Sequence, residues 1–128
     1  WKKGEFCDMT SNQVDVCDND DIPYGIFAET QATATSANDL VWVYVLEVGA
    51  VLEMCVETSG SAAAETAVNV GVAYDLGVAS NIHYIASDAT TDKVFLVLEK
   101  GSDYNSAQFT STQTPGRVKV RVLKTTTV

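Results

Sequence analysis

The chain has 128 residues, 46% of them hydrophobic, and carries a formal net charge of −9 at pH 7. This length and composition suit one domain with its own hydrophobic core, and they argue against a disordered chain. The negative charge argues against nucleic acid and anionic lipid as partners, and the longest apolar stretch, at Leu40–Leu46, is far too short for a membrane helix of ~20 residues.

The first half of the chain contains short runs of β-branched and aromatic residues separated by turn-forming residues, a pattern typical of strands. These runs predict strands at Gly4–Met9, Val14–Cys17, Tyr24–Ala28, Leu40–Leu46 and Val51–Val56. The last two have the strongest pattern, with Glu47–Ala50 as their connection, whereas Gln31–Asn38 is small and polar and indicates a loop or a weak strand. Trp42 and Tyr44 share one face of their predicted strand, and we expect them in the core or the barrel wall.

The second half continues this pattern up to the last predicted strand. Ser59–Thr66 indicates either a flexible loop or one short helix, because its alanines and Glu65 favour helix. Further strands are predicted at Val70–Tyr74, Ile82–Ala86, Val94–Leu98 and Arg117–Lys124. Ser102–Pro115 is a polar loop that is too long for a plain hairpin, and loops of this kind often carry contacts.

The spacing of these runs predicts the fold class. About eight short strands, about ten residues apart, are typical of an all-β fold, either a small single-domain β-barrel or a β-sandwich. We assign residues 1–12 to an extended N-terminal arm and the first strand, and residues 13–128 to a single β domain.

The three cysteines are Cys7, Cys17 and Cys55. Their odd number and the absence of a C-x-x-C spacing argue against a zinc site and against a disulfide framework. A disulfide between Cys7 and Cys17 across a hairpin is one alternative, and a reduced, intracellular compartment is the simpler one.

Residues suited to catalysis are scarce. His83 is the only histidine, and its place in a strand pattern indicates a surface residue or one satisfied by hydrogen bonds. Without a second histidine or a spaced cysteine cluster, a transition metal has no set of ligands. The acidic run Asp18–Asp21 lacks the glycine and the distal glutamate of an EF-hand loop, so a solvated turn is favoured over a calcium site. No glycine-rich phosphate-binding motif occurs. We therefore predict no catalytic, metal-binding or cofactor-binding residues and no enzymatic activity.

Basic side chains gather in two places in this acidic chain. Arg117, Lys119 and Arg121 form one face of the last predicted strand, opposite three valines. This basic ladder either pairs with acidic residues of a neighbouring strand, or contacts an acidic partner surface or an adjacent subunit. At the other end of the chain, Trp1 precedes Lys2 and Lys3 and has no evident core to enter, so these residues are candidates for a docking arm.

The sequence resembles a known family over much of its length. Val16–Glu29 resembles the opening of tailed-phage capsid decoration (cement) proteins, in which a short hairpin runs through an acidic turn into a strand of the form P-x-G-I-L-A-E. Val70–Leu76 and Gly116–Leu123 are similar to the middle and the end of some of these proteins. Phe27 stands where leucine or valine is commoner in the family.

The resemblance implies a function without an active site. Decoration proteins are small all-β modules that bind the outside of an expanded capsid and clamp neighbouring major capsid proteins. It also implies a homo-oligomer, with a trimer favoured, located on the outer surface of the virion after synthesis in the host cytoplasm. An N-terminal arm that orders on the capsid is common in the family, which makes Trp1–Phe6 the expected contact segment, with Phe6 as a further candidate beside the lysines.

Two other functions fit an all-β chain of this kind. A carbohydrate-binding or adhesin-type β-sandwich would use exposed aromatic residues flanked by amides, and the loop before the last strand offers a faint version in Tyr104, Asn105, Gln108 and Phe109. A minor structural subunit of a phage tail or baseplate differs from a decoration protein in its partner and not in the physics of binding.

Overall fold

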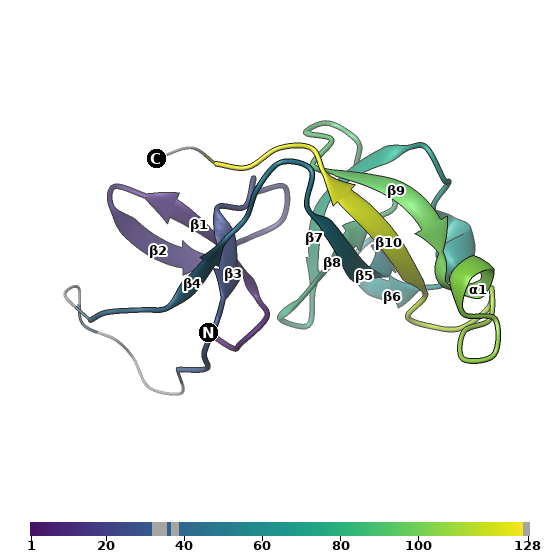
Figure 1. Cartoon of the computed structure of the whole chain (residues 1–128), viewed down its shortest axis with the longest axis horizontal. Coiled ribbons are helices and arrows are strands. Elements are labelled where there is room, and N and C mark those ends of the chain that lie inside the picture. Colours follow the sequence, from purple (N-terminus) through teal and green to yellow (C-terminus); the bar gives the residue numbers. More distant parts are fainter. Residues whose placement is uncertain (32–35, 37–38, 127–128) are drawn as a thin grey trace.

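The computed structural model describes residues 1–31, 36 and 39–126. These residues form ten strands in two sheets, together with one short 3-10 helix and one four-residue α-helix (Figure 1). The smaller sheet, at the left of Figure 1, holds β1 to β4, and the larger one, at the right, closes into a small barrel. The all-β prediction is therefore confirmed, with a barrel as its main part.

The smaller sheet has the strand order β2-β1-β3-β4 and is antiparallel throughout. Its strands are Phe6–Thr10 (β1), Gln13–Val16 (β2), Gly25–Phe27 (β3) and Val43–Val45 (β4). Ser11 and Asn12 join β1 to β2 with φ of 53° and 63°, and two successive left-handed residues give a turn that matches the twist of a tight hairpin. Pairs of left-handed residues also form the hairpin turns at Ser59-Gly60 and Ser80-Asn81.

The larger sheet closes into a ring because its last strand pairs twice. Its strands are Val51–Thr58 (β5), Ser61–Ala63 (β6), Ala73–Ala79 (β7), Ile82–Ala86 (β8), Phe95–Lys100 (β9) and Arg117–Val122 (β10). The order is β10-β9-β7-β8-β5-β6, and β10 also pairs with β5. The β10–β5 pairing is antiparallel over five residue pairs, whereas the parallel β5–β8 pairing covers only two, Val56↔Ile85 and Glu57↔Ala86.

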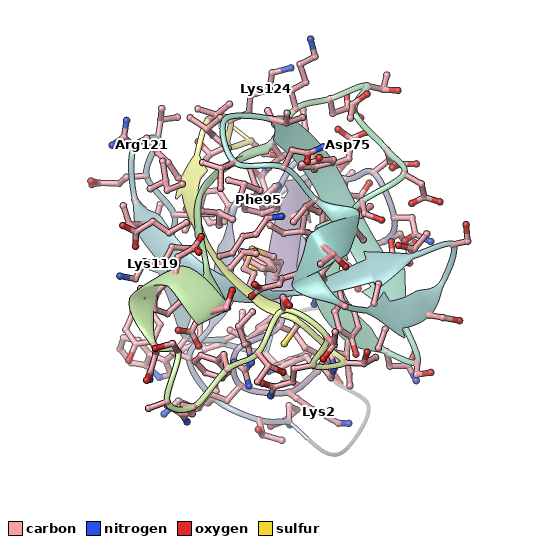
Figure 2. All side chains as sticks on the ribbon, turned by 90° about the vertical axis from the view of Figure 1, so that its right-hand side faces the viewer. Lys2, Asp75, Phe95, Lys119, Arg121 and Lys124 are labelled. Atoms are coloured by element: carbon pink, nitrogen blue, oxygen red, sulfur yellow. The ribbon has the colours of Figure 1, made fainter. Side chains whose placement is uncertain are left out.

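Alternate residues of the barrel strands build the core. Val118, Val120 and Val122 of β10 are fully buried, as their alternation with basic residues predicts. Phe95 of β9, labelled in Figure 2, is also fully buried and lies in the middle of the barrel. Burial of each of these side chains stabilises the fold by about 1.5–3 kcal/mol.

The two sheets share this core through β1 and His83. Phe6 of β1 packs with its ring centroid 5.5 Å from that of Phe95 and 5.7 Å from that of His83. The Nδ1 atom of His83 accepts a hydrogen bond from the Phe6 backbone N–H (3.2 Å), and its Nε2 atom lies 2.9 Å from the carbonyl oxygen of Cys17. The hydrogen-bond network thus assigns the proton to Nε2, and the lone histidine links β8 to the smaller sheet.

The strand predicted at Leu40–Leu46 is present but shorter, and the prediction that Trp42 and Tyr44 lie in the core or the barrel wall was wrong. Only Val43–Val45 forms a strand, and Trp42 and Tyr44 are 74% and 65% exposed rather than in the core. The reason is position: β4 is the edge of its sheet, and only β3 pairs with it among the residues that the structure describes. β3 and β4 approach closely because Gly25 has no side chain; a Cβ there would lie 2.5 Å from a Val43 methyl group and 2.6 Å from the Tyr44 oxygen.

Most other predicted strands differ from the structure by only one or two residues at an end, but three further predictions differ more. The strand expected at Val70–Tyr74 begins at Ala73 and continues through Gly77 to Ala79. Ser59–Thr66 is neither a loop nor a single helix, because β6 is followed there by the 3-10 helix η1 (Glu65–Ala67). The polar loop before β10 begins with the short helix α1 (Gly101–Tyr104). Most of the predicted loop or weak strand at residues 31–38 lies outside the described residues.

Candidate interaction surfaces

The N-terminal residues lie against the smaller sheet. The Gly4 N–H donates to the Phe27 carbonyl (2.9 Å), and the Phe27 N–H donates to the Glu5 carbonyl (3.0 Å). The Trp1 ring stacks on the Phe27 ring, with centroids 5.0 Å apart and an interplanar angle of 11°. Trp1 therefore packs against a buried aromatic side chain, contrary to the expectation that it has no core to enter.

The remaining candidates of the N-terminal segment divide into two kinds. Phe6 is only 5% exposed and packs in the core, so its side chain does not project to a partner and can be reached only as part of the lining of a groove. Lys2 and Lys3 are exposed, and their backbone N–H groups are bound by Glu5 and Thr30. The two lysines remain the part of the segment that can reach a partner.

The basic ladder on β10 is partly neutralised by neighbouring strands. Arg117 lies 3.2 Å from Glu53 of β5, and Lys119 lies 3.4 Å from Glu99 of β9. Both pairs are exposed, and such pairs stabilise a fold by about 0–1 kcal/mol. Among the described residues, Arg121 has no carboxylate within ion-pair distance, and Figure 2 shows it on the outer surface. The pairing alternative thus holds for two of the three residues.

Six of the ten exposed large hydrophobic residues in the described part of the chain lie close together in the sequence, along β4 and into β5. We call this set the β4 strip; its members are Leu40, Trp42, Tyr44, Val45, Val48 and Val51, each more than half exposed. Exposed apolar side chains gathered on one segment of a soluble protein often mark a site that binds a partner. Within the described residues, β4 is also the edge strand of its sheet, and an unpaired strand edge is a site at which other chains can pair.

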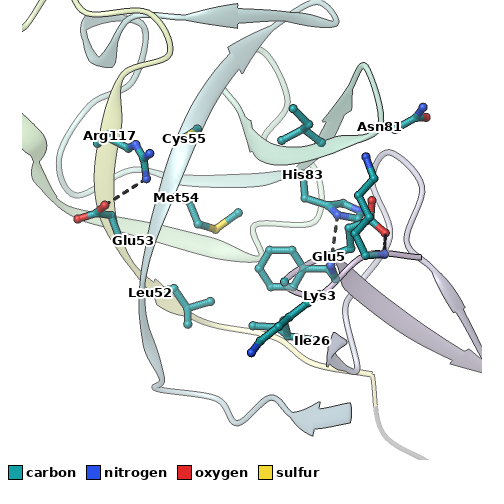
Figure 3. Close-up of a pocket in the computed structure, with 14 residues that line it drawn as sticks. Lys3, Glu5, Ile26, Leu52, Glu53, Met54, Cys55, Asn81, His83 and Arg117 are labelled. Atoms are coloured by element: carbon teal, nitrogen blue, oxygen red, sulfur yellow. Dashed lines mark hydrogen bonds and ion pairs between the residues drawn. The ribbon is translucent and has the colours of Figure 1, made fainter. Parts of the chain in front are cut away.

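A groove lies between the N-terminal segment and β5 (Figure 3). We call it the cationic groove; its volume is about 390 Å³. Its apolar lining comes from Phe6, Ile26, Leu52 and Met54, and the cationic side chains at it are Lys2, Lys3 and Arg117. Four of the seven predicted contact residues, from opposite ends of the chain, therefore meet at one place.

Three buried carboxylates, Glu57, Glu65 and Asp75, were not predicted from the sequence. Asp75 is fully buried and accepts hydrogen bonds from the backbone N–H groups of Thr91, Asp92 and Lys93, at 2.7–2.9 Å. Glu65 is 1% exposed and accepts bonds from the backbone and the hydroxyl of Ser102. These two side chains hold loops to the barrel. The only signal in the sequence is an acidic residue inside an otherwise apolar run.

Glu57 is the third buried carboxylate, and its burial should make the free energy of unfolding depend on pH. Burial raises the pKa of Glu57 above its ordinary value of 4.5. The hydrogen bond from the Gly60 N–H lowers this pKa, and the nearby carboxylates of Asp88 and Asp20 raise it. An acid with a raised folded-state pKa favours folding below its ordinary pKa, and this contribution is lost as the pH rises through the folded-state value. Glu57→Gln should therefore raise the free energy of unfolding at pH 7, and the gain should shrink toward pH 4.

Urea unfolding at the two pH values measures this effect. Glu47→Gln is the matched control, because it removes the same charge from an exposed position. A Glu57→Gln variant that gains no more at pH 7 than the control, or that gains equally at both pH values, would contradict a burial penalty at Glu57.

The cysteines are all free thiols. Cys7 is opposite Val16 in the β1–β2 ladder, and the Cys17 N–H bonds to the Phe6 carbonyl, so Cys7 and Cys17 face opposite sides of the sheet. Burial raises the pKa of Cys7 to about 11 and also raises the pKa of Cys17 and Cys55. Cys55, which lines the cationic groove, is the one cysteine that is partly exposed.

Within the described residues, no cluster of three or more His, Cys, Asp or Glu side chains could hold a metal ion, and no helix is long and apolar enough to span a bilayer. Comparison of the chain with protein-family models, with curated proteins and with solved structures found no match.

Proposed function

We propose that the chain is a non-enzymatic structural protein of a virion, which binds the outer surface of an expanded tailed-phage capsid and clamps neighbouring major capsid proteins. It would be made in the host cytoplasm and act on the capsid as a homo-oligomer, with a trimer favoured. The resemblance of Val16–Glu29 to decoration proteins supports this function, and one structural observation carries it: the exposed β4 strip.

The β4 strip has the properties of a protein contact. Trp42 and Tyr44 supply large apolar surfaces, the residue types that contribute most to binding energy in protein interfaces. Val51, at the far end of the strip, is paired in the barrel with Arg121, the ladder residue for which the described part of the chain supplies no carboxylate partner. A partner surface that is apolar with an acidic margin would therefore complement this side of the molecule.

A protein that binds the expanded shell but not the compact one stabilises the expanded shell by binding alone. A protein that binds one state of an assembly and not the other shifts the equilibrium toward the bound state by mass action. Several linked copies on one capsomer would multiply weak individual contacts, because later contacts form at a high effective concentration. No chemical step is required.

The proposal predicts that Trp42→Ser combined with Tyr44→Ser will weaken capsid binding by at least about tenfold, since interface aromatic residues each contribute on the order of 2 kcal/mol. The free energy of unfolding should change by less than about 0.5 kcal/mol, because both side chains are exposed. The measurement is co-sedimentation with expanded, undecorated phage capsids and with compact procapsids, alongside urea unfolding.

Val70→Ser combined with Val72→Ser is the control, since it changes two exposed apolar residues outside the strip. Saturable binding of the unaltered protein to expanded shells only, weakened by the strip variant and not by the control, is the expected result. Absence of binding to expanded shells at low salt would overturn the capsid function.

A carbohydrate-binding function is the second candidate, and the exposed Trp42 and Tyr44 favour it, because aromatic faces stack on sugar rings. The loop residues first considered for this role are engaged with one another and with β5: Tyr104 donates to Glu53 (3.0 Å), and Asn105 donates to Gln108 (2.7 Å). Glycan binding by the isolated protein that is lost in the strip variant would favour this candidate over the capsid.

A further inference from the structure

The barrel has one incompletely paired seam, between β5 and β8. The two strands pair only at Val56↔Ile85 and Glu57↔Ala86, near the C-terminal end of each strand. The preceding residues of β5, Val51–Cys55, pair with β10 on one side. On their other side, no strand of the described part of the chain pairs with them.

This unpaired edge of β5 lines the cationic groove. Leu52, Glu53, Met54 and Cys55 form one wall of the groove, and the start of β8 with the N-terminal segment forms the other (Figure 3). Backbone N–H and C=O groups on an unpaired strand edge can bind an extended chain by strand addition. The volume of about 390 Å³ is within the range of ligand-binding pockets in proteins.

The side chains around the edge indicate what kind of chain fits. Phe6, Leu52 and Met54 offer an apolar floor for alternate side chains of a strand. Lys2, Lys3 and Arg117 place three of the eight cationic side chains of the whole chain at this one groove. Two carboxylates also line it: Glu5, which accepts from the Lys2 backbone N–H, and Glu53. Arg117 is already paired with Glu53, so the exposed lysines are the charges available to an incoming carboxylate.

We propose that the cationic groove binds an extended acidic segment of a partner protein by strand addition to β5. The segment pairs its backbone with Leu52–Cys55, directs apolar side chains to the floor and places carboxylates at Lys2 and Lys3. This site is separate from the β4 strip and does not depend on the capsid function.

The probe is a capped six-residue peptide of alternating valine and aspartate, and the full-length protein is observed by amide NMR. The expected result is a saturable shift of the Leu52–Cys55 and Lys3–Phe6 amides at millimolar peptide. Alkylation of Cys55 should slow roughly threefold or more near saturation, since bound protein is protected in proportion to its occupancy. Cys7 and Cys17 are buried and should not react in the native state, so alkylation reports on the groove.

Two peptide controls separate charge from strand pairing. A valine–lysine peptide of the same length should not bind, and an N-methylated valine–aspartate peptide, which keeps the charges but lacks the amide donors, should bind at least tenfold more weakly. Equal binding of the N-methylated peptide would overturn strand addition, and equal binding of the lysine peptide would overturn the acidic specificity.

Variants of the protein locate the site. Lys2→Glu combined with Lys3→Glu should weaken peptide binding at least tenfold, whereas Lys124→Glu, at the opposite end of the molecule in Figure 2, should leave it within about twofold. Amide shifts that appear elsewhere, self-association through the groove without peptide binding, or no response at millimolar peptide would each overturn the proposal.

Discussion

Replacing Gly116 with alanine should destabilise the protein by about 3 kcal/mol. Gly116 stands at the entry to β10, where its N–H donates to Ala63 (2.7 Å) and its carbonyl accepts from Val56 (3.1 Å). A Cβ at this position would lie 2.7 Å from backbone atoms of both Ala64 and Glu65. Backbone atoms cannot move aside as a flexible side chain can, so the added methyl group would displace the start of β10 or the segment before η1.

Urea unfolding of Gly116→Ala measures this effect, and Gly71→Ala is the control. Gly71 has a φ of +83°, and a Cβ there would meet no other atom. Alanine at this position should therefore lower the free energy of unfolding only through the unfavourable backbone conformation, by about 1 kcal/mol. If the two substitutions destabilise the protein equally, the close contact between Gly116 and the Ala64–Glu65 backbone is contradicted.

Replacing Asp75 with alanine should destabilise the protein by about 3 kcal/mol, because three backbone donors lose their shared buried acceptor together. Asp75→Asn should cost less, since its amide oxygen can still accept from Asp92 and Lys93 while its NH₂ group opposes the Thr91 donor. In both variants, the loop at Thr91–Lys93 should open before the rest of the barrel.

Urea unfolding gives the overall change, and hydrogen exchange of the Thr91–Lys93 amides reports the loop. Asp103→Ala removes an exposed carboxylate and serves as the control, with a change of less than about 0.5 kcal/mol. An Asp75→Ala variant that unfolds like this control, or that leaves the loop amides as protected as before, would show that Asp75 does not hold the loop.

The strands that were predicted well are those whose two faces meet different surroundings. One face of β10 lies in the barrel and the other in solvent. Buried valines therefore alternate with basic residues along its sequence, and this two-residue period can be recognised without the structure. The run Leu40–Leu46 is apolar on both faces, a pattern typical of a strand covered on both sides. Sequence alone does not show whether such a strand is buried by other parts of its own chain or is left exposed on the monomer for a partner.

The contact residues show a similar limit. Lys2, Lys3 and Arg117 could be selected one by one because each is a cation in an acidic chain. Their convergence on one groove depends on the N-terminal segment lying opposite β5, a long-range relation that no local pattern contains. Asp75 and Glu65 were missed for the same reason: their donors lie 16 to 18 residues and 37 residues away in the sequence.

The double pairing of β10 has a consequence for how the chain folds during synthesis. The strand that closes the barrel against β5 follows it by about 60 residues, so the closing contacts are highly non-local and slow to form. Until β10 leaves the ribosome, β5 and β9 both present unpaired edges, and the three buried valines of β10 are missing from the core. The nascent chain therefore passes through an open, aggregation-prone sheet, and the native barrel forms only once translation has passed Val122.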